Sequence, residues 1–183
     1  MKAFLGIIAA LVIFAGMIFS SYNSLVSSNE NVTSKWSQVE NQLQRRNDLI
    51  PNLVNTVKGY AAHEQDIFKS VADARAKLNG AKTVAETSAA NAEMNSALSR
   101  LLVVVENYPD LKANSNFNQL QDELAGTENR IAVARKDYND AAQSFNTKIK
   151  SLPASLYAGM LGFKEREYFK AEEKAAQVPQ VKF

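Results

Sequence analysis

Hydrophobic positions follow three patterns along the chain, and each of them predicts helix. The first is an apolar stretch from Ala3 to Phe19, with Lys2 before it and no further charge until Glu30. At 1.5 Å per helical residue, the uncharged run through Ser21 spans roughly 28 Å, close to the ~30 Å hydrocarbon core of a bilayer. We therefore predict a transmembrane anchor over residues 1–21. The side chains predicted to form it are Ala3, Phe4, Leu5, Ile7, Ile8, Leu11, Val12, Ile13, Phe14, Ile18 and Phe19.

The charges beside this stretch predict its orientation. Lys2 and the amino terminus precede it, whereas the segment 22–31 offers only Glu30. By the positive-inside rule, the N-terminus is expected inside and the rest of the chain outside the membrane. A cleaved signal peptide is the alternative interpretation, but the apolar run is long for one and Phe19-Ser20-Ser21 is a poor cleavage sequence.

The second and third patterns are seven-residue repeats of apolar side chains, which predict amphipathic helices with one apolar seam. The earlier seam has Trp36, Leu43, Ile50 and Val57 in one column and Val32, Val39, Leu53 and Tyr60 in the other. The later seam has Phe117, Leu124, Ile131, Tyr138, Phe145 and Leu152 in its main column. Arg46 interrupts the earlier seam. Pro51 lies within it and predicts a kink rather than a helix end, because the apolar period resumes in phase.

Turn signals divide the rest of the chain into further helices. The apolar stripe of the first helix continues beyond Gly59 to Leu78, and Asn79-Gly80 is typical of a helix end. A shorter helix follows and closes before Pro109. Asn114 or Ser115 is the predicted cap of the long last helix.

These elements predict an all-α protein in which an N-terminal transmembrane helix is followed by a long antiparallel three-to-four-helix up-down bundle. The predicted parts are the anchor at 1–21, a juxtamembrane segment at 22–31, the bundle at 32–152, and C-terminal short helices with an extended tail at 153–183. A charged helix from Lys164 to Ala176 is expected within the last part. The first bundle helix is either continuous with the anchor or separate from it.

Composition argues against several functional classes. The net charge of +2 is spread along the chain without a basic block, so no nucleic-acid partner is expected. The chain has no cysteine, which excludes disulfides, thiol nucleophiles and cysteine-ligated metals. His63 is the only histidine, and a zinc site needs several ligands. We therefore expect no cofactor and no enzyme. The alternatives are a metal-dependent hydrolase that uses His63 with nearby carboxylates, and a ligand-sensing membrane protein.

Arg46 is a candidate site residue because it occupies a seam position, where a lone charge is costly to bury. We predict that it either reaches solvent or forms an ion pair with Glu106 or Glu128 of another helix. An internal ion pair that sets helix register is the main interpretation, and contact with a ligand is the alternative.

Two surfaces are candidates for contact with a partner. The loop residues Tyr108, Asp110, Leu111 and Lys112 combine an aromatic, an aliphatic and two charged side chains. The alternative is that this loop only joins two helix ends. The apolar stretch from Ser155 to Phe163 has three interpretations: packing on the bundle, contact with the bilayer surface, or contact between subunits.

Several longer phrases carry a family resemblance. They are Tyr22 to Val26, Arg45 to Val54, Gly59 to Glu64, Val105 to Ala113, Leu120 to Leu124, Thr127 to Ala132, Ala134 to Asn139, and Pro179 to Phe183. Together they resemble the bacterial LemA family over nearly the whole chain. The resemblance implies a single-pass membrane protein with a helical bundle and an accessory role in the envelope. It carries over no catalytic residues.

The sequence as a whole thus predicts a non-enzymatic protein of the bacterial cytoplasmic membrane. Its partners are expected to be the lipid bilayer, through the N-terminal helix, and either further copies of the chain in a homo-oligomer or another envelope protein. Its role is expected to be that of an assembly subunit or adaptor. Tethering to a surface favours such contacts because it raises the local concentration.

Overall fold

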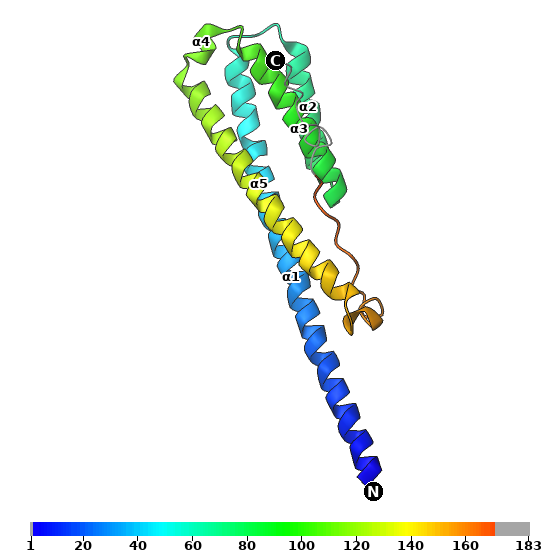
Figure 1. The fold of residues 1–183 in the computed structure, drawn as a ribbon. Coiled ribbons are helices and arrows are strands. Elements are labelled where there is room, and N and C mark those ends of the chain that lie inside the picture. The colour runs from blue at the N-terminus through cyan, green and yellow to red at the C-terminus, as the bar shows by residue number, and fades with distance from the viewer. Residues whose placement is uncertain (1, 171–183) are drawn as a thin grey trace, which may run out of the picture.

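The chain folds into a long helical bundle (Figure 1), seen in a computed structural model that describes residues 2–170, apart from some side chains near the start of the first helix. Its elements are α1 (Lys2–Lys58), α2 (Gln65–Gly80), α3 (Val84–Val105), α4 (Pro109–Lys112), α5 (Ser115–Lys150) and the 3-10 turn η1 (Ala154–Leu156). Residues 2–170 contain no strand. The all-α prediction is confirmed.

Helix α1 is one continuous element that runs from the start of the chain to the far end of the bundle (Figure 1). It passes through Pro51 and ends seven residues later at Lys58, so the prediction that the proline does not end the helix is confirmed. The predicted anchor and the first bundle helix are therefore parts of the same helix.

The anchor itself stays a prediction at this point. Within the described residues, the structure contains no helix that is sufficiently long and apolar to span a bilayer. The side chains of five anchor residues lie outside those that the structure describes: Ala3, Ile7, Leu11, Ile13 and Phe14. The described side chains of Phe4, Leu5, Ile8, Val12 and Phe19 are all exposed, and that of Ile18 is half-buried.

The chain reverses at residues 59–64, where the sequence pattern was interpreted as continuing helix. Only Ala61 of this turn is buried, in the distal cluster, and residues 58–66 contain no large aliphatic side chain that would continue the apolar stripe. Gly59 also weakens helix at this position. Because of this reversal, the four main helices alternate in direction, and α5 returns along α1 toward the N-terminus (Figure 1).

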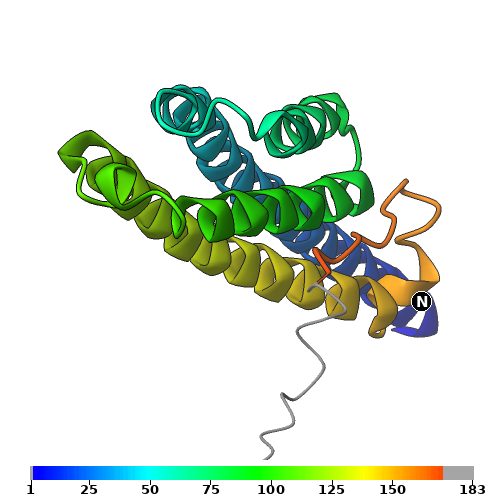
Figure 2. The same ribbon diagram turned by 90° about the horizontal axis from the view of Figure 1, so that it is seen from above.

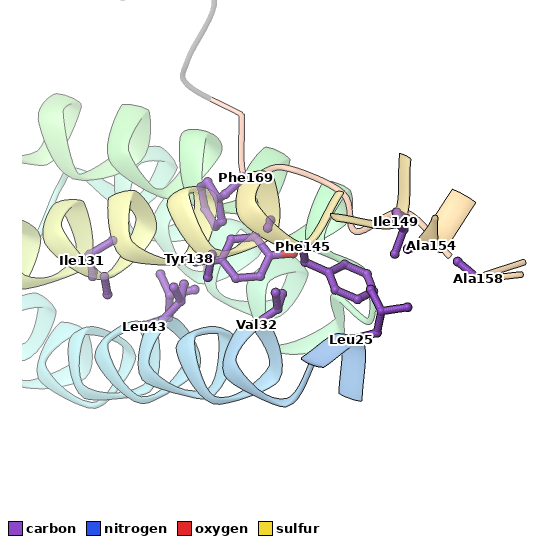
Figure 3. Packing of buried hydrophobic residues seen from close by; sticks show 14 residues of the cluster. Leu25, Val32, Leu43, Ile131, Tyr138, Phe145, Ile149, Ala154, Ala158 and Phe169 are labelled. Atoms are coloured by element: carbon purple, nitrogen blue, oxygen red, sulfur yellow. The ribbon is translucent and has the colours of Figure 1, made fainter. Parts of the chain in front are cut away.

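The bundle consists of two closely packed pairs, α1 with α5 and α2 with α3. Seen from above, α3 runs between α2 and α5, and α1 passes behind it (Figure 2). The buried side chains form two clusters. The proximal cluster joins α1, α5 and the segment after α5, and Figure 3 shows its members meeting between these elements. The distal cluster joins all four main helices near the turns.

Local signals set the helix starts. Thr83 Oγ1 accepts from the backbone N–H of Glu86, and the Glu86 carboxylate accepts from the backbone N–H of Thr83, so α3 begins with a capping box. The backbone N–H groups of Lys82 and Thr83 both donate to the Glu86 carboxylate, and these hydrogen bonds lower the pKa of Glu86. Asn114 Oδ1 accepts from Phe117 N–H at 3.0 Å and caps α5, as predicted.

The segment after α5 folds back on the bundle. Residues 152–163 form a compact turn-rich unit around η1, which we call the proximal lobe, and Leu152 of the predicted seam is exposed because α5 ends before it. Residues 164–170 are extended, which corrects the prediction of a helix from Lys164. Several of their backbone groups bond to side chains of α5, and Lys170 O also accepts from Ser88 Oγ of α3. The remainder of that predicted helix, 171–176, and the tail 179–183 lie outside the described residues.

Candidate functional site

A polar layer crosses the middle of the bundle at the position where Arg46 interrupts the apolar seam. Arg46 is only 1% exposed. Its Nη1 donates to Glu128 Oε2 of α5 at 2.7 Å and to Asn95 Oδ1 of α3 at 2.7 Å. Its Nη2 donates to Asn91 Oδ1 of α3 at 2.5 Å. One side chain of α1 thus contacts both α3 and α5.

The next residue of α1 reaches the remaining helix. Asn47 Nδ2 donates to Asn79 Oδ1 of α2 at 2.7 Å, and Arg75 Nε of α2 donates to Asn47 Oδ1 at 3.1 Å. Arg46 and Asn47 therefore connect α1 to all three other main helices. We call this set of side chains the central polar layer.

The central polar layer lies between the two apolar clusters. Leu43 belongs to the proximal cluster and Ile50 to the distal cluster, one helical turn on either side of the layer. A buried polar side chain is satisfied only when its partners are in register, so such a layer disfavours helices that slide by a turn. The arrangement suits an internal ion pair that fixes the alignment of four helices.

Of the two acids considered for Arg46, the structure brings only Glu128 to it. Glu106 lies at the C-terminal end of α3 and accepts from Lys112 Nζ at 2.6 Å. Asn91 and Asn95 were not predicted from the sequence as partners of Arg46. Asn91 nevertheless stands seven residues before Leu98 and fourteen before Val105, in the buried column of α3. A polar residue in a seam was therefore the available signal on both helices.

A groove borders the polar layer between α3 and α5. It has a volume of about 370 Å³ and is lined mainly by Leu53, Leu98, Leu102 and Leu124, with Arg46 and Glu128 at one side. Because Glu128 is 41% exposed on its side chain, the ion pair forms part of the groove wall. A ligand that contacts Arg46, the alternative interpretation, would have to bind in this groove.

The loop predicted as a contact surface lies at the far end of the bundle, beside the turn between α1 and α2 (Figure 1). Tyr108 Oη donates to Glu64 Oε1 at 3.3 Å, and Asn114 Nδ2 donates to Tyr60 Oη at 3.0 Å. Burial and the nearby Glu64 carboxylate raise the pKa of Tyr108, which keeps it a donor. These contacts tie the two turns together into one surface, which we call the distal end.

The four residues predicted for this surface do not behave alike. Asp110 and Lys112 are exposed and Tyr108 is half-buried. Leu111 is fully buried in the distal cluster, so its side chain is part of the core and not of a contact surface. The loop therefore joins helix ends and also presents charged side chains to solvent.

His63 is exposed in the turn between α1 and α2. In the part of the chain that the structure describes, no three His, Asp or Glu side chains are grouped in a way that could hold a metal ion. The alternative of a metal site built on His63 thus gains no ligands from residues 2–170.

The extended segment 164–170 lies along α5 and is held by side-chain amides. Asn146 donates to Arg166 O at 2.8 Å and accepts from Arg166 N–H at 2.8 Å. Asn139, two turns earlier on α5, makes the same pair of bonds to Phe169, at 2.9 and 2.8 Å. Tyr138 Oη donates to Glu167 O at 2.7 Å, and burial raises the pKa of Tyr138, so its hydroxyl stays protonated. These bonds satisfy the backbone N–H and C=O groups of Arg166 and Phe169 and the C=O of Glu167 without secondary structure.

We expect Asn146→Ala to release this segment locally. Two hydrogen bonds are lost, each worth about 1 kcal/mol, which corresponds to roughly 30-fold more opening. Trypsin should then cleave after Arg166 correspondingly faster, because opening of the segment also breaks the hydrogen bonds from the Arg166 guanidinium to Asn29 Oδ1. Gln143→Ala is the matched control, since it removes an exposed amide from the same helix. Equal cleavage rates in both variants would contradict the prediction.

The geometry defines the class of this protein as an all-α, four-helix bundle with a polar layer between two apolar clusters. A model of the LemA family matches residues 35–183, and the chain belongs to that family. Similar curated proteins include magnetosome protein MamQ 1 of Paramagnetospirillum magneticum, 29% identical over 94% of this chain and 72% of the relative. Magnetosome protein MamQ of Magnetospirillum gryphiswaldense is also 29% identical, with the same coverage. Protein LemA of Metamycoplasma hominis is 26% identical over 82% of this chain and 69% of the relative.

Proposed function

We propose that this protein is a membrane-anchored, non-enzymatic helical bundle that works through protein–protein contacts in the bacterial envelope, as an assembly subunit or adaptor. The observation that carries the proposal is the continuity of α1 over 57 residues. It makes the uncharged start of the chain and the distal end two ends of one helix. Such a helix holds the distal end at a fixed distance from the bilayer.

Two further observations support a contact role. The distal end presents Asp110 and Lys112 to solvent, together with Val103 near the end of α3, whose apolar side chain is 68% exposed. The relatives carry the names of magnetosome and LemA proteins, and none of these is an enzyme name. The seams and polar layer give the bundle the rigidity that a scaffold for contacts requires.

The membrane anchor and its orientation can be tested with one engineered cysteine, because the natural chain has none. The variant Val103→Cys is placed in intact bacteria that have been made permeable only at their outer membrane. A maleimide that cannot cross the cytoplasmic membrane should label it without detergent, and the protein should resist alkaline extraction from membranes. Labelling that requires detergent would reverse the orientation, and release at alkaline pH would contradict the anchor.

The contact role is tested in the same cells. Brief crosslinking, purification through a C-terminal tag in mild detergent and mass spectrometry should yield a discrete homo-oligomer or one consistent second protein. In a homo-oligomer under oxidising conditions, Val103→Cys should form a disulfide with a second copy of the chain. Val133→Cys should not, although Val133 is 62% exposed on α5. Recovery of a monomer alone from both variants would contradict the role.

A further inference from the structure

The proximal lobe packs on the part of α1 that follows the uncharged stretch, at Tyr22 and Leu25. Its inner side chains Ala154 and Ala158 are buried in the proximal cluster together with Leu25. The ring of Phe163 lies 6.0 Å from that of Tyr22 and 6.1 Å from that of Phe145. The lobe contacts both α1 and α5, and is therefore fixed to the bundle.

The lobe closes on itself in a defined conformation. The backbone N–H of Phe163 donates to Ala158 O at 3.0 Å, and Gly162 N–H donates to Gly159 O at 3.1 Å. Gly162 has φ +84°, a left-handed conformation that glycine adopts without the steric cost of a side chain. The outer surface of the lobe is thus a structured surface.

That outer surface is apolar. Leu152, Leu156, Met160 and Leu161 are all exposed, with Leu156 at 71% and Met160 at 85%. A soluble domain rarely gathers so many large exposed apolar side chains in one short segment without a partner that covers them. The buried face of the lobe already packs on the bundle, so this second face requires a different partner.

The position of the lobe indicates which partner covers its exposed apolar side chains. The predicted anchor ends near Ser21, and the lobe packs on Tyr22 and Leu25, within about 9 Å of helix from Phe19. The headgroup region on each side of a bilayer is ~6 Å thick, and interfacial segments bury their apolar face ~5–10 Å deep. In Figure 1 the lobe lies beside α1 on the N-terminal side of the bundle. The outer face of the lobe is therefore level with the membrane surface.

The charges around the lobe match a bilayer surface. No acid occurs between Lys148 and Lys164, and Lys148, Lys150 and Lys164 are all exposed. Lys150 also pairs with Glu165 at 2.7 Å, outside this interval. Lysines at the rim of an apolar face are attracted to anionic lipid headgroups.

We propose that the proximal lobe is a second membrane attachment: its outer apolar face inserts into the headgroup boundary of the bilayer that the N-terminal part of α1 enters. This inference rests on the proposed anchor and deepens it. One helix alone leaves the bundle free to tilt and rotate about its anchor. The lobe adds a second point of attachment, which fixes the orientation of the bundle relative to the membrane.

The test uses three single-cysteine variants of the full chain, each labelled with an environment-sensitive fluorophore. Met160→Cys reports on the lobe, Val12→Cys on the anchor and Val103→Cys on the distal end. The proteins are placed in liposomes of phosphatidylcholine with a minor fraction of phosphatidylglycerol, and lipids that carry a nitroxide either near the headgroup or deep in the acyl chain act as quenchers. The shallow nitroxide should quench the label at 160, the deep nitroxide should quench the label at 12, and neither should quench the label at 103.

The possible failures are distinguishable. If the label at 12 is quenched and that at 160 is not, the lobe does not touch lipid and the inference is wrong while the anchor stands. If neither is quenched, the anchor fails and the inference fails with it. If the label at 160 is shielded from water but not quenched by lipid, a second copy or another protein covers the lobe, which also overturns the inference.

A charge variant separates insertion from proximity. In a Leu152→Cys background, the pair Leu156→Glu and Met160→Glu should abolish quenching of the label at 152. Both side chains are exposed, so the helical content should not change. Val133→Glu, an exposed apolar position on α5, should leave the quenching unchanged. Equal quenching in the two charge variants would contradict insertion of the lobe.

Discussion

Replacing Glu128 with alanine is expected to destabilise the bundle by about 3 kcal/mol. The guanidinium of Arg46 is almost fully buried, and it would keep Asn91 and Asn95 but lose the Glu128 carboxylate. Removing one partner of a buried ion pair costs about 3–5 kcal/mol, and the partial exposure of Glu128 places this case at the lower end. Urea unfolding of the full chain in mild detergent, followed by circular dichroism, measures the loss.

The neighbouring ion pair supplies the control. Arg45 Nη2 and Glu123 Oε2 are 3.0 Å apart and join the same two helices, but both side chains are exposed. Glu123→Ala should therefore cost less than about 1 kcal/mol. In an Arg46→Met background, Glu128→Ala should also cost little, because position 46 then carries no buried guanidinium for Glu128 to stabilise. Equal losses for Glu128→Ala and Glu123→Ala would show that the layer does not stabilise the fold.

This layer shows how much of the site the sequence predicts. A seven-residue seam predicts the buried face of each helix, and Arg46 stands out because it breaks that seam. Its partner helices could not be derived, since the same pattern fits several ways of pairing four helices. The seam predicted Ile50 and Phe145 as core residues, and both are buried.

The turn at residues 59–64 shows why the topology was harder to predict than the helices. A stripe that resumes in phase after a polar interval is compatible with one long helix and with two antiparallel helices. Local helix propensity differs little between these two arrangements. The choice depends on which of them buries more of the apolar face. Folding back lets Phe68 and Val71 pack in the distal cluster with Leu53 and Val57.

The extended segment after the lobe was mispredicted for a related reason. Its residues favour helix locally, but its partners are the amides of Asn139 and Asn146, which lie two turns apart on α5. Such tertiary hydrogen bonds override a weak propensity. The signal that sequence alone could offer was the seven-residue spacing of these two asparagines beside Tyr138 and Phe145.

Phe169→Ala is expected to detach this segment from the bundle. The Phe169 side chain is buried in the proximal cluster, its ring centroid lies 6.3 Å from that of Trp36, and the Arg135 guanidinium lies 4.5 Å from it. Loss of a buried phenylalanine costs about 3–5 kcal/mol, and a short docked segment places the value near the lower end. Trp36 is the only tryptophan, so its fluorescence emission should shift to the red as water replaces the ring.

Tyr168→Ala is the matched control, because Tyr168 is the adjacent aromatic residue and its side chain is exposed. It should leave the Trp36 emission and the unfolding midpoint within error of the natural protein. The ring of Tyr138, 5.1 Å from that of Trp36, stays in place in both variants, so any difference between their spectra comes from the segment. Identical Trp36 spectra in the two variants would mean that the segment is not docked on α1 and α5 in solution.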